Sequence, residues 1–182
     1  MKTILFATTN DRKIREAQAA CKQFGINVKQ VKLNIDEIQS HNPQTIAKRK
    51  AQAAYSLIQK PIVVSDTYWN IPALQGFPGG YMKDVANWFN PEDFLNLVKD
   101  KADKQISFTE SIVYQDKTKT KVFSKEFWGT FADKPKGNGN SIEQVAKFNG
   151  YTIGERRDQG KLSHDPKNYI WFDFVKWYRK LK

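Results

Sequence analysis

The sequence predicts an α/β protein whose second half is rich in β-strands. Short apolar runs with β-branched residues alternate with helical patterns in the amino-terminal half, and a hairpin pattern follows them. Hydrophobic residues make up 40% and aromatic residues 13% of the 182 residues, which is enough to fill a core. No repeat or linker interrupts the chain, so we expect one domain over residues 1–182.

Three strands and two helices are expected in the amino-terminal half. Apolar or alternating runs predict strands over residues 2–8 and 27–34 and a third strand from residue 62. A group of cap residues predicts a helix from residue 11 to about 24, and Asn42-Pro43 opens a second helix over residues 45–59. The third strand is apolar on both faces, as a central strand should be, and we expect it to end at Asp66.

The later elements also have local signals. A loop rich in Gly and Pro covers residues 72–80, and Asn90-Pro91 opens a helix that has acids in its first turn. Two runs predict a β-hairpin over residues 105–115 and 120–131. Asp165-Pro166 opens the last helix, whose apolar positions follow helical spacing at Ile170, Phe174, Trp177 and Leu181.

Charge and composition limit the classes of partner that this protein is expected to bind. The formal net charge is +11, from 30 Lys and Arg against 19 Asp and Glu, which favours anionic partners such as nucleotides, nucleic acids or acidic surfaces. No apolar run reaches the roughly 20 residues that a membrane helix needs, so we expect no membrane partner. The single cysteine, Cys21, excludes an intrachain disulfide, and we expect a reducing cytoplasm.

Polar residues follow the first strand, and open α/β sheets bind their ligands beyond the carboxyl ends of strands. Thr8-Thr9-Asn10 stands at the start of a helix, where free N–H groups and the helix dipole attract phosphate. Lys13 is one turn further and can reach the same anion. An ordinary capped helix explains the same residues, and on these residues alone we favour that reading.

Asp66, after the third strand, is the second candidate for a functional site. A carboxylate after the third strand can hold Mg²⁺ or accept a proton from an attacking water, whereas a cap or turn residue is the alternative. Asp36 and Glu37 follow the second strand, and Lys48 belongs to the next helix. Together these side chains offer acids for a metal and lysines for phosphate oxygens, the combination that phosphoryl chemistry requires.

Four segments over roughly residues 1–100 match one family in sequence and spacing. Thr8-Thr9-Asn10-x-x-Lys13-x-x-Glu16 is similar to a T/S-x-N-x-x-K-x-x-E phosphate loop, and Glu37 lies at the position of a metal-binding glutamate. Thr45-Ile46-Ala47-Lys48 resembles a segment that carries a phosphate-contacting lysine. Val64-Ser65-Asp66-Thr67, followed by residues 73–81, is similar to a V-E-D-[ST]…A-L-x-G-x-P-G-x-Y block. These segments resemble the inosine triphosphate pyrophosphatase family.

The resemblance implies an elongated mixed β-sheet flanked by helices, with two lobes and a central nucleotide cleft, usually in a homodimer. It implies hydrolysis of the α-β anhydride of nucleoside triphosphates, by default deaminated purines, with Asp66 and Lys13 as catalytic residues. Asp66 and Glu37 would bind Mg²⁺, or Mn²⁺ in its place. The triphosphate substrate would be held by Lys13 together with Thr8, Thr9, Asn10, Lys48, Thr67, Lys161, Ser163 and His164.

The sequence departs from the family pattern in three places. Ser65 stands where the family has an acid, and the base-contacting F-G-[YW]-D-P motif is absent. The closing K-N-x-x-S-H-R becomes residues 161–165, so that Asp165 replaces an arginine that contacts the purine. A carboxylate accepts where an arginine donates, so the preferred base edge should differ, although Asp165 also reads as a helix cap. Base-stacking candidates, each favoured as a core residue, are Trp69, Phe148 and Tyr151.

Two other classes of function compete with a pyrophosphatase. A nucleotide-binding or regulatory protein with weakened catalysis on the same fold is motivated by the loss of the acid at Ser65. A nucleic-acid binder is motivated by the positive charge and the aromatic residues, but no motif of the common nucleic-acid modules is present. We therefore expect a nucleotide substrate and rank a nucleic-acid partner last.

Overall fold

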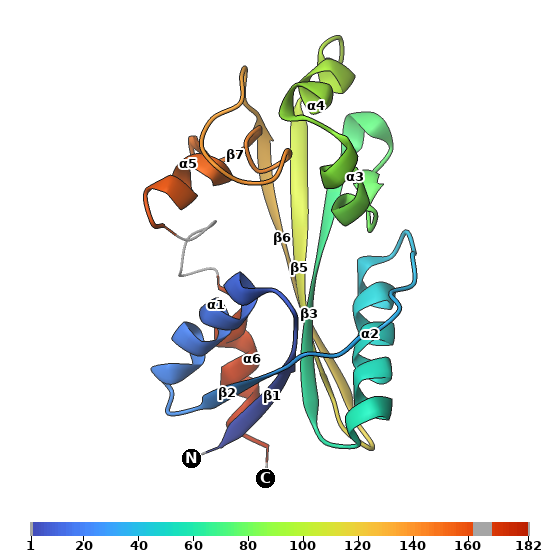
Figure 1. Cartoon of the computed structure of the whole chain (residues 1–182), viewed down its shortest axis with the longest axis vertical. Coiled ribbons are helices and arrows are strands. Elements are labelled where there is room, and N and C mark those ends of the chain that lie inside the picture. The colour runs from blue at the N-terminus through green and yellow to red at the C-terminus, as the bar shows by residue number, and fades with distance from the viewer. Residues whose placement is uncertain (1, 162–168, 182) are drawn as a thin grey trace. The chain divides into compact units, whose positions relative to one another are not determined.

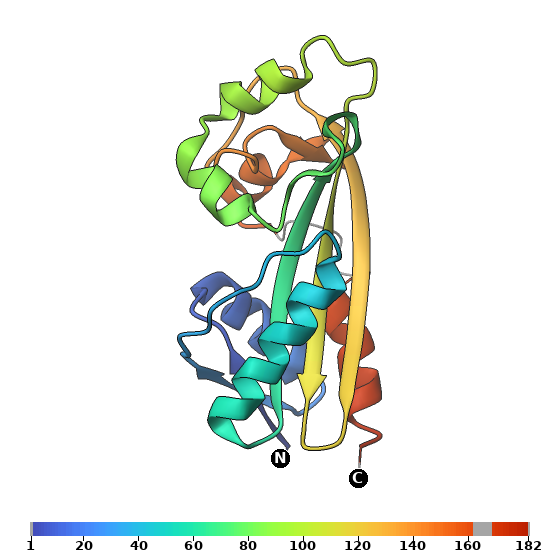
Figure 2. The same ribbon diagram turned by 90° about the vertical axis from the view of Figure 1, so that its right-hand side faces the viewer.

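The computed structural model describes residues 2–161 and 169–181 and divides them into two compact units (Figures 1 and 2). The first unit comprises residues 2–67, 110–125 and 169–181, and the second comprises residues 68–109 and 126–161. Within the described ranges, no helix is both long enough and apolar enough to cross a membrane.

The first unit begins with alternating strands and helices. These are β1 (Thr3–Ala7), α1 (Asp11–Lys22), β2 (Asn27–Val31), α2 (Pro43–Ile58) and β3 (Ile62–Ile71), of which the last four residues belong to the second unit. Strand β1 pairs in parallel with both β2 and β3, so residue Phe6 lies opposite Gln30 on one side and Val63 on the other. The unit is completed by α6 (Ile170–Tyr178) and by parts of β5 (Gln105–Gln115) and β6 (Thr120–Phe131).

The two faces of the first unit's strands are covered by different helices. Side chains alternate along a strand, so neighbouring residues enter different core groups. Val63 packs with residues of α1 and α6, whereas Ile62 and Val64 pack with the alanines of α2. Figures 1 and 2 accordingly show α2 on one side of the strands and α1 and α6 on the other. Both faces are therefore buried, as the sequence of β3 predicts.

The second unit is built around a separate aromatic core. Its elements are the ends of β3, β5 and β6 together with η1 (Pro72–Leu74), β4 (Phe77–Gly79), α3 (Met82–Trp88), α4 (Pro91–Val98), β7 (Ala146–Phe148), β8 (Tyr151–Thr152) and α5 (Ile153–Asp158). Trp69 and Phe108 pack with ring centroids 5.2 Å apart, and Phe148 lies against both rings. The hydrogen-bonded strand order is β2-β1-β3-β5-β6-β7-β8, with β4 paired to β3, which makes a mixed sheet.

The predicted elements agree with the structure in kind, and the hairpin of β5 and β6 agrees to the residue. Strand β2 ends at Val31, three residues before the predicted end. Helix α2 begins at Pro43 with Asn42 as its N-cap, so Asn42-Pro43 opens this helix as predicted. The expected loop over residues 72–80 contains a 3₁₀ turn and the short strand β4. The predicted start of the last helix, Asp165-Pro166, lies outside the described residues.

The prediction that Asp66 ends the third strand is wrong. Strand β3 continues for five residues past Asp66 to Ile71, so Asp66 lies inside the strand. The reason is the sequence that follows, because Trp69 and Ile71 are aromatic and β-branched residues that alternate into the core of the second unit. Residues Trp69–Ile71 also pair antiparallel with β4, a partner that the loop-like sequence of residues 77–79 conceals.

Candidate functional site

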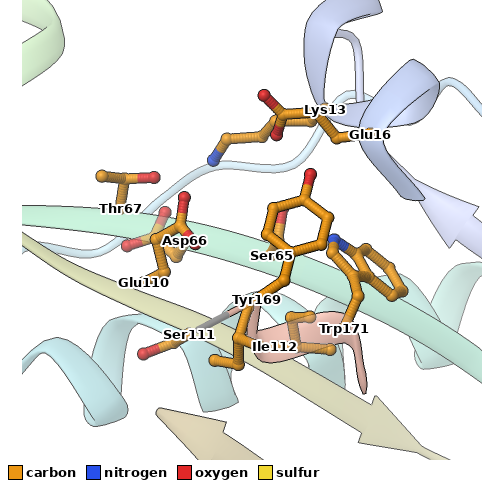
Figure 3. Close-up of a pocket in the computed structure, with 11 residues that line it drawn as sticks. Lys13, Glu16, Ser65, Asp66, Thr67, Glu110, Ser111, Ile112, Tyr169 and Trp171 are labelled. Carbon is orange, nitrogen blue, oxygen red and sulfur yellow. The ribbon is translucent and has the colours of Figure 1, made fainter. Parts of the chain in front are cut away.

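A pocket within the first unit gathers charged side chains from α1, β3 and β5 (Figure 3). Its charged lining residues are Lys13 and Glu16 from α1, Asp66 from β3 and Glu110 from β5. The remaining lining residues are Ser65, Thr67, Ser111, Ile112, Tyr169, Ile170 and Trp171. Figure 3 shows the ammonium group of Lys13 and the carboxylates of Asp66 and Glu110 directed into the same space.

The start of α1 fixes the direction of Lys13. Asn10 is the N-cap residue, and its Oδ1 accepts hydrogen bonds from the N–H groups of Arg12 at 2.9 Å and Lys13 at 3.2 Å. The hydroxyl of Thr8 accepts from the N–H of Asn10 at 3.1 Å, which fixes the turn that leads from β1 into the helix. The side chains of Thr8 and Asn10 are thus engaged as capping groups, which agrees with the capped-helix reading.

Lys50 joins the two acids that the sequence assigns to a metal. Its Nζ lies 2.5 Å from Oε1 of Glu37 and 3.8 Å from Oδ1 of Asp66. The side chains of Lys50 and Asp66 are 17% and 14% exposed, whereas Glu37 is 43% exposed. The pair of Lys50 and Asp66 is therefore largely withdrawn from water, where its charges interact more strongly than at the surface.

Burial dominates the electrostatics of Asp66 and Lys13. Burial raises the pKa of Asp66 above its ordinary value, while Lys13, Lys50 and the N–H of Thr67 act in the opposite direction. Burial lowers the pKa of Lys13, while the charges of Asp66 and Glu110 oppose that shift. The raised carboxyl pKa makes Asp66 a stronger base, and the lowered ammonium pKa makes Lys13 a stronger acid, and acid–base catalysis uses both properties.

Glu110 was not among the site residues that the sequence predicts. Burial and the charge of Glu16 raise the pKa of Glu110 to about 7, and the opposing charge of Lys13 only partly offsets this rise. Tyr169 belongs to the same group, because burial and the charges of Glu16 and Glu110 raise the pKa of its hydroxyl. A signal for Glu110 was present in the sequence, because this acid interrupts the alternating apolar residues of β5 between Phe108 and Ile112.

Lys50 was missed as well, and Lys48 was predicted in its place. Ile46 and Ala54 are buried residues of α2, and Lys50 is spaced four residues from each, so it shares their face of the helix. Lys48 is exposed, and Lys50 is the α2 lysine that reaches Asp66. That i, i+4 spacing is the signal that could have distinguished the two lysines.

The site residues that the sequence predicts fall into three groups in the structure. In the first group, the structure brings Lys13, Asp66 and Thr67 together in the pocket and links Glu37 to Asp66 through Lys50. In the second group, Thr9 is exposed before α1, and Lys161 is exposed after α5 in the second unit. The third group, Ser163 and His164, lies outside the described residues. The residues of the second and third groups remain predicted substrate ligands.

The structure also shows which of the base-stacking candidates are buried. Trp69 and Phe148 are buried in the core of the second unit, as expected, with 6% and 4% of their surface exposed. Tyr151 is 48% exposed, so the expectation that it is a core residue is wrong. Its side chain projects from the two-residue strand β8 into solvent, whereas the neighbouring Thr152 is buried.

The donor set fits a hard divalent cation. Among the residues that the structure describes, no group of three or more His, Cys, Asp or Glu side chains gathers as a complete metal cage. Mg²⁺ does not require one, because it keeps several waters and is usually held by one or two carboxylates and by substrate phosphates. Asp66 and Glu37, which share the ammonium group of Lys50, supply carboxylates of that kind.

The fold and the pocket together define an α/β protein with a mixed sheet and a partly buried site of lysines and carboxylates. The chain belongs to the Ham1 family, whose sequence model matches residues 4–163.

Individual relatives cover almost the whole chain. It is 32% identical to the dITP/XTP pyrophosphatase of Methanopyrus kandleri, over 97% of this chain and 96% of that protein. It is 27% identical to the dITP/XTP pyrophosphatase of Hyperthermus butylicus, over 98% of this chain and 96% of that protein. The Ham1 protein of Staphylococcus aureus has a similar fold, with a TM-score of 0.79, 22% identity and full coverage of both chains. The structural similarity supports the predicted fold class, an α/β protein with a mixed sheet flanked by helices.

Proposed function

We propose that this protein is a nucleoside triphosphate pyrophosphatase that converts (d)NTPs to a nucleoside monophosphate and pyrophosphate. The observation that carries the proposal is the pocket in which Lys13 and the partly buried Asp66 meet, with Lys50 bound to the same carboxylate. Lysines at this site suit phosphate oxygens, and a carboxylate suits the attacking water. Relatives that span nearly the whole chain are named dITP/XTP pyrophosphatases, so deaminated purines are the default substrates.

Asp66 is the group that accepts a proton from the attacking water. The oxygen of that water forms a bond to the α-phosphorus, and the bond from this phosphorus to the bridging oxygen of pyrophosphate breaks. Burial raises the pKa of Asp66, which makes it a stronger base than an exposed aspartate. Lys13 and Lys50 hold the phosphate oxygens and offset the charge that develops on the leaving pyrophosphate.

Mg²⁺, or Mn²⁺ in its place, is the cofactor of the proposed reaction. Asp66 and Glu37 would hold it, and when bound it would neutralise charge on the triphosphate. Further substrate contacts are proposed for the amino-terminal loop of Thr8, Thr9 and Asn10, whose helix start attracts anions. The remaining proposed substrate ligands are Thr67, Lys161, Ser163 and His164, and Lys48 is kept only as the alternative to Lys50 within α2.

Residues 1–182 are proposed to act as one domain with two lobes, in a cytoplasmic homodimer. A nucleotide-binding protein with weakened catalysis is the second candidate, and it is less favoured because the relatives carry the names of active enzymes. Ser65 is the observation that motivates this second candidate, because the acid of the family pattern is missing at that position.

The test is pyrophosphate release from a panel of natural, deaminated and modified NTPs with Mg²⁺ or Mn²⁺. We expect release from dITP or XTP with the wild-type protein, and its abolition in Asp66→Asn at an unchanged melting temperature. Exposed Asp100 provides the control Asp100→Asn, which should retain full activity. Nucleotide binding without pyrophosphate release from any NTP would favour the weakened protein, and neither binding nor release would end both proposals.

A further inference from the structure

Glu110 projects from the same face of the sheet as Ser65. Strands β3 and β5 are hydrogen-bonded neighbours. Val63, two residues before Ser65, and Ile112, two residues after Glu110, pack in the same core group beside α1 and α6. Because side chains alternate along a strand, Ser65 and Glu110 share that face, and both line the pocket. An acid at position 65 would therefore direct its carboxylate toward the region that Glu110 occupies.

Ser65 leaves a polar atom unsatisfied in this pocket. Its Oγ is buried and has no hydrogen-bond partner within the described part of the chain. Buried hydroxyl groups are usually paired, so one that lines a pocket is expected to find its partner in what binds there. The short side chain of Ser65 also occupies less of the pocket than the glutamate of the family pattern. This difference leaves space for a carboxylate from β5.

The formal charges of the side chains around Asp66 indicate a role for Glu110. Lys50 contacts Glu37 and Asp66, and Lys13 is the other ammonium group that acts on Asp66. These two cations and two carboxylates cancel, and Arg12, whose Nη1 lies 3.9 Å from Oε1 of Glu16, offsets the other acid of the pocket. Without Glu110 the group therefore has no surplus negative charge to attract a divalent cation. Glu110 adds the missing negative charge, and a bound cation would in turn favour the ionised form of its carboxyl group.

We propose that Glu110 adds a carboxylate to the metal–triphosphate site beside Asp66 and Glu37, in place of the acid that the family pattern has at position 65. The inference rests on the proposed function, because it takes a metal-bound triphosphate as the ligand. Figure 3 shows the carboxylates of Glu110 and Asp66 directed, with the ammonium group of Lys13, into one pocket. Carboxylate oxygens are the ligands that Mg²⁺ and Mn²⁺ prefer.

The test measures the binding of Mn²⁺ alone by electron paramagnetic resonance, with the full chain freed of metal. The variants are Glu110→Gln, Ser65→Glu, the double variant S65E/E110Q, and Glu92→Gln as a control at an exposed glutamate of α4. We expect roughly tenfold weaker Mn²⁺ binding in Glu110→Gln, the effect typical of losing one group of a metal site. The double variant should regain most of this affinity because it returns a carboxylate to the same face, and Glu92→Gln should match the wild type.

Wild-type Mn²⁺ affinity in Glu110→Gln would overturn the inference, and so would a double variant no better than Glu110→Gln. Glutamine has nearly the shape of glutamate, so we expect Glu110→Gln to fold. If circular dichroism shows that it does not, Glu110→Asp gives the same comparison, since it withdraws the carboxylate by one methylene group. Pyrophosphate release is measured in parallel. Absence of release in the wild type contradicts the proposed function alone, because the Mn²⁺ comparison still decides the role of Glu110.

Discussion

Lys50 places its Nζ 2.5 Å from Oε1 of Glu37, and the same nitrogen lies 3.8 Å from Oδ1 of Asp66. Glu37 belongs to the segment between β2 and α2, and Asp66 lies inside β3, so one ammonium group connects residues that are 29 positions apart in the sequence. With its side chain 17% exposed, Lys50 is held between two carboxylates rather than solvated. It is therefore positioned to exchange a carboxylate partner for a phosphate oxygen.

Replacing Lys50 should impair catalysis much more than replacing Lys48. Lys50→Ala removes a cation next to Asp66 and leaves two acids without their shared partner, so we expect a loss of about 100-fold or more in kcat/KM for pyrophosphate release. Lys48→Ala removes an exposed lysine of the same helix and should change kcat/KM less than threefold. Steady-state kinetics with dITP compare the two variants.

This comparison also tests the assignment of Lys48 as a phosphate ligand. Lys50→Arg retains the charge and should recover part of the activity, whereas a purely structural role would give a lower melting temperature with little change in kcat/KM. A Lys48→Ala variant that loses as much activity as Lys50→Ala would restore Lys48 to the site.

Glu155 should stabilise the second unit in a manner that depends on pH. The N–H of Thr152 donates to Oε2 of Glu155 at 2.8 Å, while the hydroxyl of Thr152 accepts from the N–H of Glu155 at 3.0 Å. This capping box, chiefly through the Thr152 N–H and with help from Lys136, holds the pKa of Glu155 below its ordinary value. Glu155→Ala should lower the melting temperature by about 2–4 °C at pH 7, since a cap contributes about 1 kcal/mol.

The sign of the pH dependence follows from the lowered pKa of Glu155. The stabilisation is fully present above the pKa of the unfolded chain and disappears as pH falls through the lower pKa of the folded state. The difference in melting temperature between the wild type and Glu155→Ala should therefore shrink from neutral pH toward pH 3. Thermal melts over this range measure it, with Asp100→Ala, at an exposed position, as the control. A constant difference at all pH values would refute the charge-dependent part of the cap.

Gly129 has no space for a side chain. A Cβ there would lie 2.3 Å from the carbonyl oxygen of Lys147 and 2.7 Å from the ring of Phe148, on the strand that pairs with β6. Gly129→Ala must push β7 away from β6, which should cost about 1–3 kcal/mol of unfolding free energy. Urea denaturation measures this cost. Gly25→Ala is the comparison, because no atom lies within 4 Å of its Cβ and only its φ of +67° is unfavourable. An equal or larger loss at Gly25 would contradict the steric argument.

Local sequence patterns predicted much of the fold because they depend on neighbouring residues. The hairpin of β5 and β6 was located to the residue, since its strands and turn have distinct compositions. Strand β3 was cut short because its continuation pairs with β4, a partner that only folding brings alongside Trp69. The short strands β7 and β8 were not predicted, since three or two residues carry too little periodicity.

The sequence by itself determined the α/β class and the resemblance to a pyrophosphatase family, and it predicted Asp66 and Lys13 as catalytic residues. These conclusions depend on residue type and on spacing along the chain, which the sequence displays directly. Only the tertiary structure decided that Lys50 contacts Asp66 and that Glu110 shares a face with Ser65. Such relationships depend on which helix covers which face and on which strands become neighbours. Packing over long sequence separations sets both, and the local pattern does not contain it.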